Sequence, residues 1–297
     1  MKVWLEAFRL RTLPLSLSGI VVGVAAAGMN GFWDGKVIGL ALLTTVLFQI
    51  VSNLANDLGD GLKGTDNDER VGPTRTIQSG KISVKQMKIA VLLGSLLSLL
   101  SASFLIYFGG KSLPANISLF YIFLAVSCVL AALLYTLGKK AYGYLGLGDF
   151  FVFIFFGLVS VLGVYPLLTK QLDLKLMPAA VAIGLLSVAV LNLNNMRDRV
   201  NDEQSGKKTL VVRIGGMQAK RYHTALIISA LGSWSLFSMW NFFPAILLSL
   251  LPFALLFIHL MKVWKIKEER LYDPHLKLVA LSTFAIAVLY LLSLSLK

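Results

Sequence analysis

Two short polar segments, about half a chain apart, hold most of the acidic side chains of this sequence. The chain has 15 Asp and Glu residues among 297, and eight of them fall in or directly after residues 53–66 and 192–202. These eight are Asp57, Asp60, Asp66, Asp68, Glu69, Asp198, Asp202 and Glu203. Each segment directly follows a long apolar run. A chain that concentrates its few carboxylates in two places is expected to use them together.

The spacing inside each segment favours a shared face, provided that the preceding apolar run continues as a helix. Residues three or four apart lie on the same side of a helix. Asp57 and Asp60 have this relation, as do Asp198 and Asp202. The amides that join these faces are Asn53, Asn56, Asn194 and Asn195. Two sets of oxygen ligands are therefore predicted at two helix ends.

Oxygen ligands in this arrangement favour a hard divalent cation. Mg²⁺ typically takes one or two carboxylates, keeps several waters and binds substrate phosphates. Clustered carboxylates also repel one another and raise a pKa unless a cation neutralises them. The histidines argue against zinc, because His223, His259 and His275 are scattered along the sequence. Mg²⁺ is the predicted cofactor.

Basic side chains follow both acidic segments. Carboxylates, a metal and Lys or Arg together suit a diphosphate, whose oxygens need both kinds of cation. We interpret one set as substrate contacts: Lys63, Arg70, Arg197 and Lys207. We interpret a second set as ordinary loop charges: Lys85, Lys88, Lys220 and Arg221.

The rest of the chain is apolar enough to identify its class. Hydrophobic residues make up 57% of the sequence, charged residues 14%, and the mean hydropathy is +0.76. Repeated apolar runs of membrane-spanning length predict an all-α, polytopic membrane helix bundle, forming a single domain over residues 1–297. Nine spans are predicted, over about 13–29, 37–55, 87–108, 117–137, 147–168, 176–193, 222–240, 243–263 and 277–296. Two long Asp-rich loops are predicted over about 53–86 and 192–221.

The distribution of Lys and Arg predicts the orientation. With the N-terminus in the cytoplasm, 23 of the 28 fall in inside segments and five in outside segments. Inside loops are enriched in Lys and Arg. This bias explains the net charge of +13 as a consequence of membrane orientation, so the charge does not indicate nucleic-acid binding. Both acidic segments then lie on the cytoplasmic side, where the site is expected to open.

A diphosphate site at a membrane face suggests a lipid diphosphate whose tail lies among the helices. Ionisation of an allylic diphosphate leaves a carbocation, which aromatic faces stabilise. Candidate aromatic groups are Tyr135, Tyr142, Tyr144, Phe150 and Phe151. The alternative is that these residues belong to the aromatic belt found at membrane interfaces.

The two segments resemble the paired Asp-rich motifs of the UbiA superfamily of intramembrane aromatic prenyltransferases. Asn56-Asp57-x-x-Asp60 is similar to its first motif and Asp198-x-x-x-Asp202 to its second. Flanking residues extend the resemblance over 54–64, 70–73, 78–80, 142–149, 194–198 and 206–215. They are most similar to the members of the superfamily that act on 1,4-dihydroxy-2-naphthoate.

The resemblance implies nine helices in a bacterial cell membrane and a Mg²⁺-dependent reaction. A polyprenyl group passes from polyprenyl diphosphate to 1,4-dihydroxy-2-naphthoate, CO₂ is lost, and demethylmenaquinone forms. The implied ligands of Mg²⁺ and diphosphate are Asn56, Asp57, Asp60, Asp198 and Asp202, with Lys63, Arg197 and Lys207 on phosphate oxygens. This chain departs from some relatives at Asn194 and Asn195, where they carry an aspartate.

Three alternatives remain open from the sequence. Relatives that prenylate 4-hydroxybenzoate, homogentisate or haem share the Asp motifs. A cation-coupled transporter is a different class, but it should carry ionisable groups near mid-span. Asp149 also has two interpretations: it orients the aromatic acceptor, or it is a first-turn acid favoured by the helix dipole.

Overall fold

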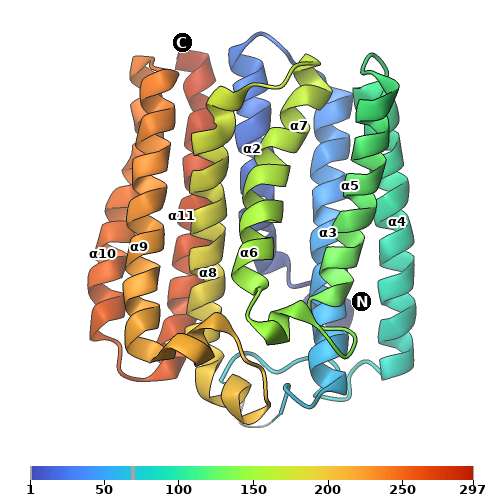
Figure 1. Ribbon diagram of the computed structural model, residues 1–297, viewed down its shortest axis with the longest axis vertical. Coiled ribbons are helices and arrows are strands. Elements are labelled where there is room, and N and C mark those ends of the chain that lie inside the picture. Colours follow the sequence, from blue (N-terminus) through green and yellow to red (C-terminus); the bar gives the residue numbers. More distant parts are fainter. Residues whose placement is uncertain (1, 68–70, 297) are drawn as a thin grey trace.

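In the computed structural model, the described residues, 2–67 and 71–296, form helices and connecting loops with no strand among them. The long helices run roughly parallel to one another as a single bundle (Figure 1). The α-helices are α1 (Lys2–Phe8), α2 (Leu13–Met29), α3 (Gly35–Leu62), α4 (Val84–Gly110), α5 (Ala115–Leu134), α6 (Gly148–Val152), α7 (Ser160–Thr169), α8 (Met177–Gln204), α9 (Leu210–Trp240), α10 (Leu251–Lys265) and α11 (Asp273–Leu292). The short turns are η1 (Leu10–Thr12), η2 (Tyr142–Leu145), η4 (Leu174–Leu176), η5 (Pro244–Leu250), η6 (Glu269–Tyr272) and η7 (Ser293–Leu296), and η3 (Phe153–Val159) is a π-helix.

Eight helical segments within the described ranges are long and apolar enough to cross a membrane. Each overlaps one predicted span, and the predicted span that none of them overlaps is 222–240, which falls in α9. This helix stands beside the others and packs along α8 (Figure 1). Its apolar residues are interrupted by His223 and by several serines. The all-helical membrane bundle is thus confirmed, whereas the ninth span stays a prediction.

The segment over 147–168 is built from three pieces, α6, η3 and α7. The π-helical piece contains Gly157, which lies against α8. A Cβ added at Gly157 would meet the Ala180 carbonyl oxygen and the Gly184 Cα at 2.6 Å. A glycine is needed here because the two backbones approach this closely. π-helical turns often occur at functional sites, and this one lines the cavity described below.

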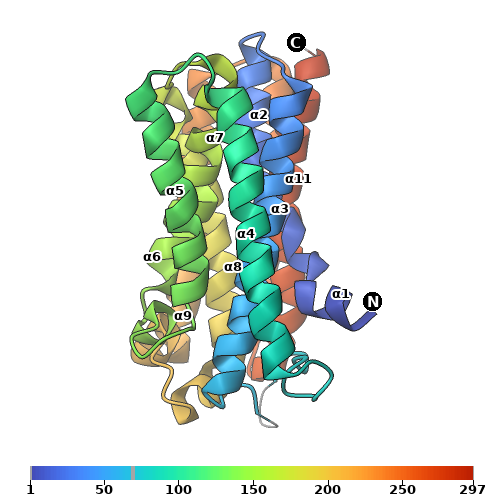
Figure 2. The same cartoon turned by 90° about the vertical axis from the view of Figure 1, so that its right-hand side faces the viewer.

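One end of the bundle, which we call the polar end, carries both acidic segments. It is formed by the last turns of α3 and α8 and by the connecting residues 63–67, 71–83, 135–147 and 205–209. The structure shortens both predicted loops, because α3 continues to Leu62 and α8 to Gln204. The aspartates therefore lie on rigid helical turns. Helix α1 projects sideways from the bundle near this end (Figure 2).

Candidate active site

The last turns of α3 bury the first acidic segment. Asn53, Asp57 and Asp60 are 3%, 1% and 8% exposed, which is far below what polar side chains show without partners. Asn53 donates to the Phe8 carbonyl oxygen (2.9 Å) and to the Thr12 hydroxyl (3.0 Å), so α3 is tied to the start of the chain.

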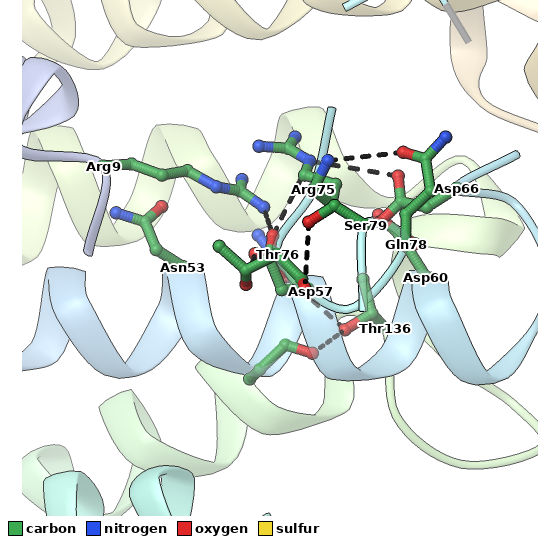
Figure 3. Close-up of polar contacts among 12 residues, drawn as sticks. Arg9, Asn53, Asp57, Asp60, Asp66, Arg75, Thr76, Gln78, Ser79 and Thr136 are labelled. Atoms are coloured by element: carbon green, nitrogen blue, oxygen red, sulfur yellow. Dashed lines mark hydrogen bonds and ion pairs between the residues drawn. The ribbon is translucent and has the colours of Figure 1, made fainter. Parts of the chain in front are cut away.

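Asp57 is enclosed by two arginines and a threonine from other segments (Figure 3). Arg9, which lies between α1 and η1, forms an ion pair with its carboxylate. Arg75 Nε lies 3.6 Å from Oδ1, and Thr76 donates to Oδ2 at 3.2 Å. Arg75 also lies 3.9 Å from Asp66 Oδ1. Buried charges need this kind of compensation, because an isolated buried carboxylate is very costly.

Asp60 has different partners. The Tyr144 hydroxyl donates to Oδ1 at 2.7 Å, and Lys207 Nζ lies 3.8 Å from Oδ2. Tyr144 also shares a hydrogen bond with Thr65 (2.6 Å). The ammonium of Lys63 lies 3.8 Å from the centre of the Tyr144 ring, and that of Lys207 lies 5.4 Å from it. Tyr144 therefore links both lysines to the first acidic segment.

The second acidic segment holds its own cation. Arg197, only 2% exposed, binds both oxygens of the adjacent Asp198 at 2.9 and 2.7 Å. Nη2, one of the two nitrogens that bind Asp198, also donates to Asn194 (2.9 Å), and Nη1 donates to Asp273, the first residue of α11. Such two-point binding of a carboxylate by arginine is strong and fixes both groups.

Lys207 joins the two segments. Its ammonium lies 3.6 Å from Asp202 Oδ1 as well as 3.8 Å from Asp60 Oδ2. Burial lowers the pKa of Lys207, but Asp60 and Asp202 outweigh this and raise it well above its ordinary value. The lysine is therefore charged. Asp202 Oδ2 is buried and has no hydrogen-bond partner among the described residues.

Both acidic segments border one large cavity of about 540 Å³, the main cavity. At the polar end its wall includes Asp60, Asp198, Asp202 and Lys207. Further from that end the lining is mainly apolar and includes Ile20, Leu105, Leu124 and Leu167. No described residue of α9 or α10 lines it. The main cavity thus combines a charged head with an apolar body.

An aromatic wall connects the two parts of the main cavity. Tyr135 meets Tyr142 edge to face at 5.3 Å, Tyr142 stacks on Phe151 at 4.0 Å, and Phe151 stacks on Phe155 at 6.3 Å. All four line the main cavity. Burial raises the pKa of the Tyr135 hydroxyl to about 12, so this wall is uncharged at neutral pH.

The structure brings most predicted site residues to the main cavity, but not all. Asn53, Asn56, Asp60, Arg197, Asp198, Asp202, Lys207, Tyr135 and Tyr142 line it. Five others do not: Asp57, Lys63, Tyr144, Asp149 and Asn195. Asp57, Lys63 and Tyr144 still contact the charged network. Asn195 is buried in α8. Arg70 lies outside the described residues.

Asp149 stands apart from the charged head. It lies in the first turn of α6 and accepts a hydrogen bond from the Tyr222 hydroxyl (3.3 Å). This placement agrees with a first-turn acid. Its role in orienting an acceptor stays a prediction.

Sequence reasoning missed six charged residues that line the main cavity: Arg9, Arg11, Asp66, Arg75, Asp273 and Lys277. Asp66 belongs to the first acidic segment, so the clustering of carboxylates was a signal for it. Asp273 begins α11, and it reaches Arg197 through the packing of α11 against α8.

The histidines also correct the sequence analysis, which treated them as scattered. His259 lies 2.8 Å from His223 and 2.9 Å from His275, nitrogen to nitrogen, in a row across α9, α10 and α11. The described residues nevertheless contain no group of three His, Cys, Asp or Glu side chains placed to hold a metal. The histidine row therefore connects helices and does not form a metal centre.

The carboxylates of the main cavity fit Mg²⁺ as a hydrated, substrate-borne ion. Asp60 comes from α3, Asp198 and Asp202 come from α8, and Asp202 Oδ2 has no hydrogen-bond partner in the described part of the chain. No tight carboxylate cage is present there. Mg²⁺ commonly takes one or two protein carboxylates, with waters and phosphate oxygens as its other ligands. The donor set suits such an ion.

The fold and the site together define a class: a helical membrane protein whose two acidic motifs meet at one end of an intramembrane cavity. Residues 16–284 match the UbiA prenyltransferase family. The chain is 42% identical over 240 residues to the 1,4-dihydroxy-2-naphthoate octaprenyltransferase of Escherichia coli (strain K12), covering 81% of this chain and 77% of that protein. It is 45% identical over 232 residues to the Haemophilus influenzae protein of the same name, covering 76% and 74%.

Solved structures show the same fold. A UbiA homologue from Aeropyrum pernix K1 in its apo form aligns with a TM-score of 0.67 at 16% identity, over 95% of this chain and 96% of that one. A homologue from Archaeoglobus fulgidus bound to DMAPP and Mg²⁺ aligns with a TM-score of 0.64 at 15% identity, over 95% and 98%. This chain belongs to the UbiA prenyltransferase family.

Proposed function

We propose that this protein transfers a polyprenyl group from polyprenyl diphosphate to 1,4-dihydroxy-2-naphthoate, with loss of CO₂, to form demethylmenaquinone. The observation that carries the proposal is the main cavity, in which a charged head from two acidic motifs meets an apolar body. The names of the relatives in E. coli and H. influenzae support the choice of acceptor. The Mg²⁺ and DMAPP bound by the A. fulgidus homologue support the choice of donor.

The charged head would hold the diphosphate. Asp60, Asp198 and Asp202, with Asn56, would hold Mg²⁺, which supplies positive charge to the leaving group. Lys207 lies between the two motifs and would contact phosphate oxygens directly. Arg197 is fixed by Asp198 and Asp273, so it would present a rigid guanidinium at the wall. Cations placed in advance where negative charge develops are a major source of catalysis.

The aromatic wall would shield the allylic cation and exclude water. Tyr135, Tyr142 and Phe151 line the main cavity between the charged head and the apolar body. A cation near these ring faces is stabilised electrostatically. An electron-rich naphthoate ring needs no strong base to attack such a cation. The most important tasks of the site are therefore to position the ring against the allylic carbon and to exclude water.

The proposed location is the inner membrane of a bacterium, with the polar end facing the cytoplasm. The bias of Lys and Arg toward the polar end supports this orientation. In a Cys128→Ser background, a cysteine at Lys111 should react with an impermeant thiol reagent outside intact cells. A cysteine at Lys139 should stay protected, and the reverse pattern would rule out this orientation.

The experiment that tests the function is product analysis with the purified protein. A polyprenyl diphosphate, Mg²⁺ and either 1,4-dihydroxy-2-naphthoate, 4-hydroxybenzoate or homogentisate are supplied in parallel, and products are identified by mass spectrometry. We expect a prenylated, decarboxylated product from the naphthoate alone, and none after chelation with EDTA. A product from 4-hydroxybenzoate or homogentisate alone would assign a different acceptor.

A further inference from the structure

A second cavity lies at the polar end beside the main cavity, and we call it the vestibule. Its volume is about 390 Å³. It is lined by residues 5, 6 and 9–11, around the junction of α1 and η1, and by residues 73–76. Asp57 of the first acidic motif lines the vestibule and does not line the main cavity.

The vestibule and the main cavity share three arginines, Arg9, Arg11 and Arg75. Arg9 and Arg75 are held by the Asp57 carboxylate (Figure 3). Arg11 is exposed and forms no hydrogen bond or ion pair with the residues that the structure describes. One arginine on the border of both cavities is therefore available to an incoming anion.

The acidic residue at the rim does not cancel this charge. Glu6 also lines the vestibule, but its carboxylate is bound by Lys81 Nζ at 2.9 Å. Asp57 is shared between two arginines. Among the described residues that line the vestibule, three arginines stand against two carboxylates, a formal excess of one positive charge that favours an anion in a concave site.

Part of the vestibule lining is apolar. Leu5 and Leu10 line it and are 52% and 46% exposed, and Pro73 lines it as well. Apolar walls around a few placed polar groups are typical of sites for small organic ligands, and about 390 Å³ lies in their size range. An aromatic acid matches this pattern, because its ring suits the leucines and its carboxylate suits Arg11.

We propose that the vestibule is the entry site for the aromatic acid acceptor, with Arg11 binding the acceptor carboxylate. The proposal rests on the proposed function. The acceptor would enter from the polar end, and its ring would pass the shared arginines into the main cavity. Prenyl diphosphate would occupy the main cavity, so the two substrates need not compete for one opening. The leaving diphosphate is the other anion of the reaction, and the test must separate it from the acceptor.

The first variant is Arg11→Gln, with steady-state kinetics in both substrates. Losing a charge-assisted contact should raise the KM for 1,4-dihydroxy-2-naphthoate about tenfold or more, while the KM for prenyl diphosphate stays within about twofold. Arg11→Lys should recover part of the loss. The matched control is Arg221→Gln, which removes an exposed arginine of α9 that lines neither cavity. It should leave both KM values unchanged.

The second variant fills the vestibule without removing a charge. Thr74 lies on its wall and is exposed. Thr74→Trp should raise the acceptor KM and leave the KM for prenyl diphosphate unchanged. Comparing Thr74→Trp with Arg11→Gln distinguishes the effect of filling the vestibule from the effect of removing a positive charge. Unchanged acceptor KM values in both variants would overturn the proposal.

Inhibitor pairs identify the anion. In the wild type, 1-hydroxy-2-naphthoate should compete with the acceptor more strongly than 1-naphthol, which lacks the carboxylate. Arg11→Gln should remove most of that difference. If Arg11→Gln instead weakens inhibition by inorganic diphosphate and leaves the acceptor KM unchanged, the vestibule serves the leaving group and the acceptor assignment is wrong. Failure of the proposed function would be distinct, because the wild type itself would then form no prenylated product from 1,4-dihydroxy-2-naphthoate.

Discussion

The two acidic motifs have similar spacing but different surroundings. In the second motif, Asp198 and Asp202 both line the main cavity, and their cations, Arg197 and Lys207, come from the same stretch of chain. In the first motif, Asp60 lines the main cavity while Asp57 lines the vestibule. The cations of Asp57 come from residue 9 and residue 75. One motif is assembled locally and the other by long-range packing.

Helix geometry explains the difference. With 3.6 residues per turn, side chains four apart differ by about 40° around the axis and side chains three apart by about 60° in the other direction. The wider angle allows Asp57 and Asp60 to border separate cavities. We infer a division of labour in which Asp60, Asp198 and Asp202 serve the diphosphate and Asp57 organises the arginines.

The largest expected effect comes from the carboxylates of the main cavity. Asp202→Asn and Asp60→Asn should each lower kcat at least about 100-fold, because each removes a fixed charge from the site where Mg²⁺ and diphosphate meet. Both variants should still insert and purify as monodisperse protein. Near wild-type turnover in Asp60→Asn would show that the first motif does not take part in catalysis.

A second prediction contrasts Asp57 with Asp60 in stability. Asp57→Asn leaves Arg9 and Arg75 without their shared anion, and breaking a buried ion pair in this way costs about 3 kcal/mol. Asp60 lines the main cavity, where it would bind substrate, and it is not enclosed by two arginines. Asp60→Asn should therefore destabilise the protein less than Asp57→Asn. Thermal unfolding in detergent measures the difference. Equal losses of stability would contradict the division of labour.

The third prediction concerns Tyr144, which connects the first motif to both lysines. Tyr144→Phe keeps the ring beneath Lys63 but removes the hydroxyl that donates to Asp60. A lost hydrogen bond to a charged group costs about 1.5–3 kcal/mol, so turnover should fall about tenfold or more. Tyr144→Leu removes the ring as well and should weaken prenyl diphosphate binding further. Identical kinetics in the two variants would exclude a role for the ring.

The smallest expected effect is that of Asp149→Asn. Asp149 lies in the first turn of α6, bonded to Tyr222, and does not line the main cavity. Asparagine also accepts hydrogen bonds at helix starts, so kcat and both KM values should change by less than about twofold. A marked rise in the acceptor KM alone would restore the alternative that Asp149 orients the acceptor.

Composition, the length of apolar runs and motif spacing were enough to predict the helix bundle, and α2 spans the predicted 13–29. The i, i+3 and i, i+4 pattern also predicted helical acidic faces. The pairing of Arg9 with Asp57, 48 residues apart, was beyond such patterns. So were the joining of Asp273 to Arg197 and the histidine row. The spacing of residues along the sequence determines which side chains share a helix face. The contacts named here depend instead on how separate helices pack against one another.

The central claim is that two distant motifs build one diphosphate site. Isothermal titration of the purified protein with a non-hydrolysable prenyl diphosphate analogue tests it most directly. We predict one analogue bound per chain in the presence of Mg²⁺, and loss of that binding in either Asp60→Asn or Asp202→Asn. Binding that survives substitution in one of the motifs, or two analogues bound per chain, would contradict the account.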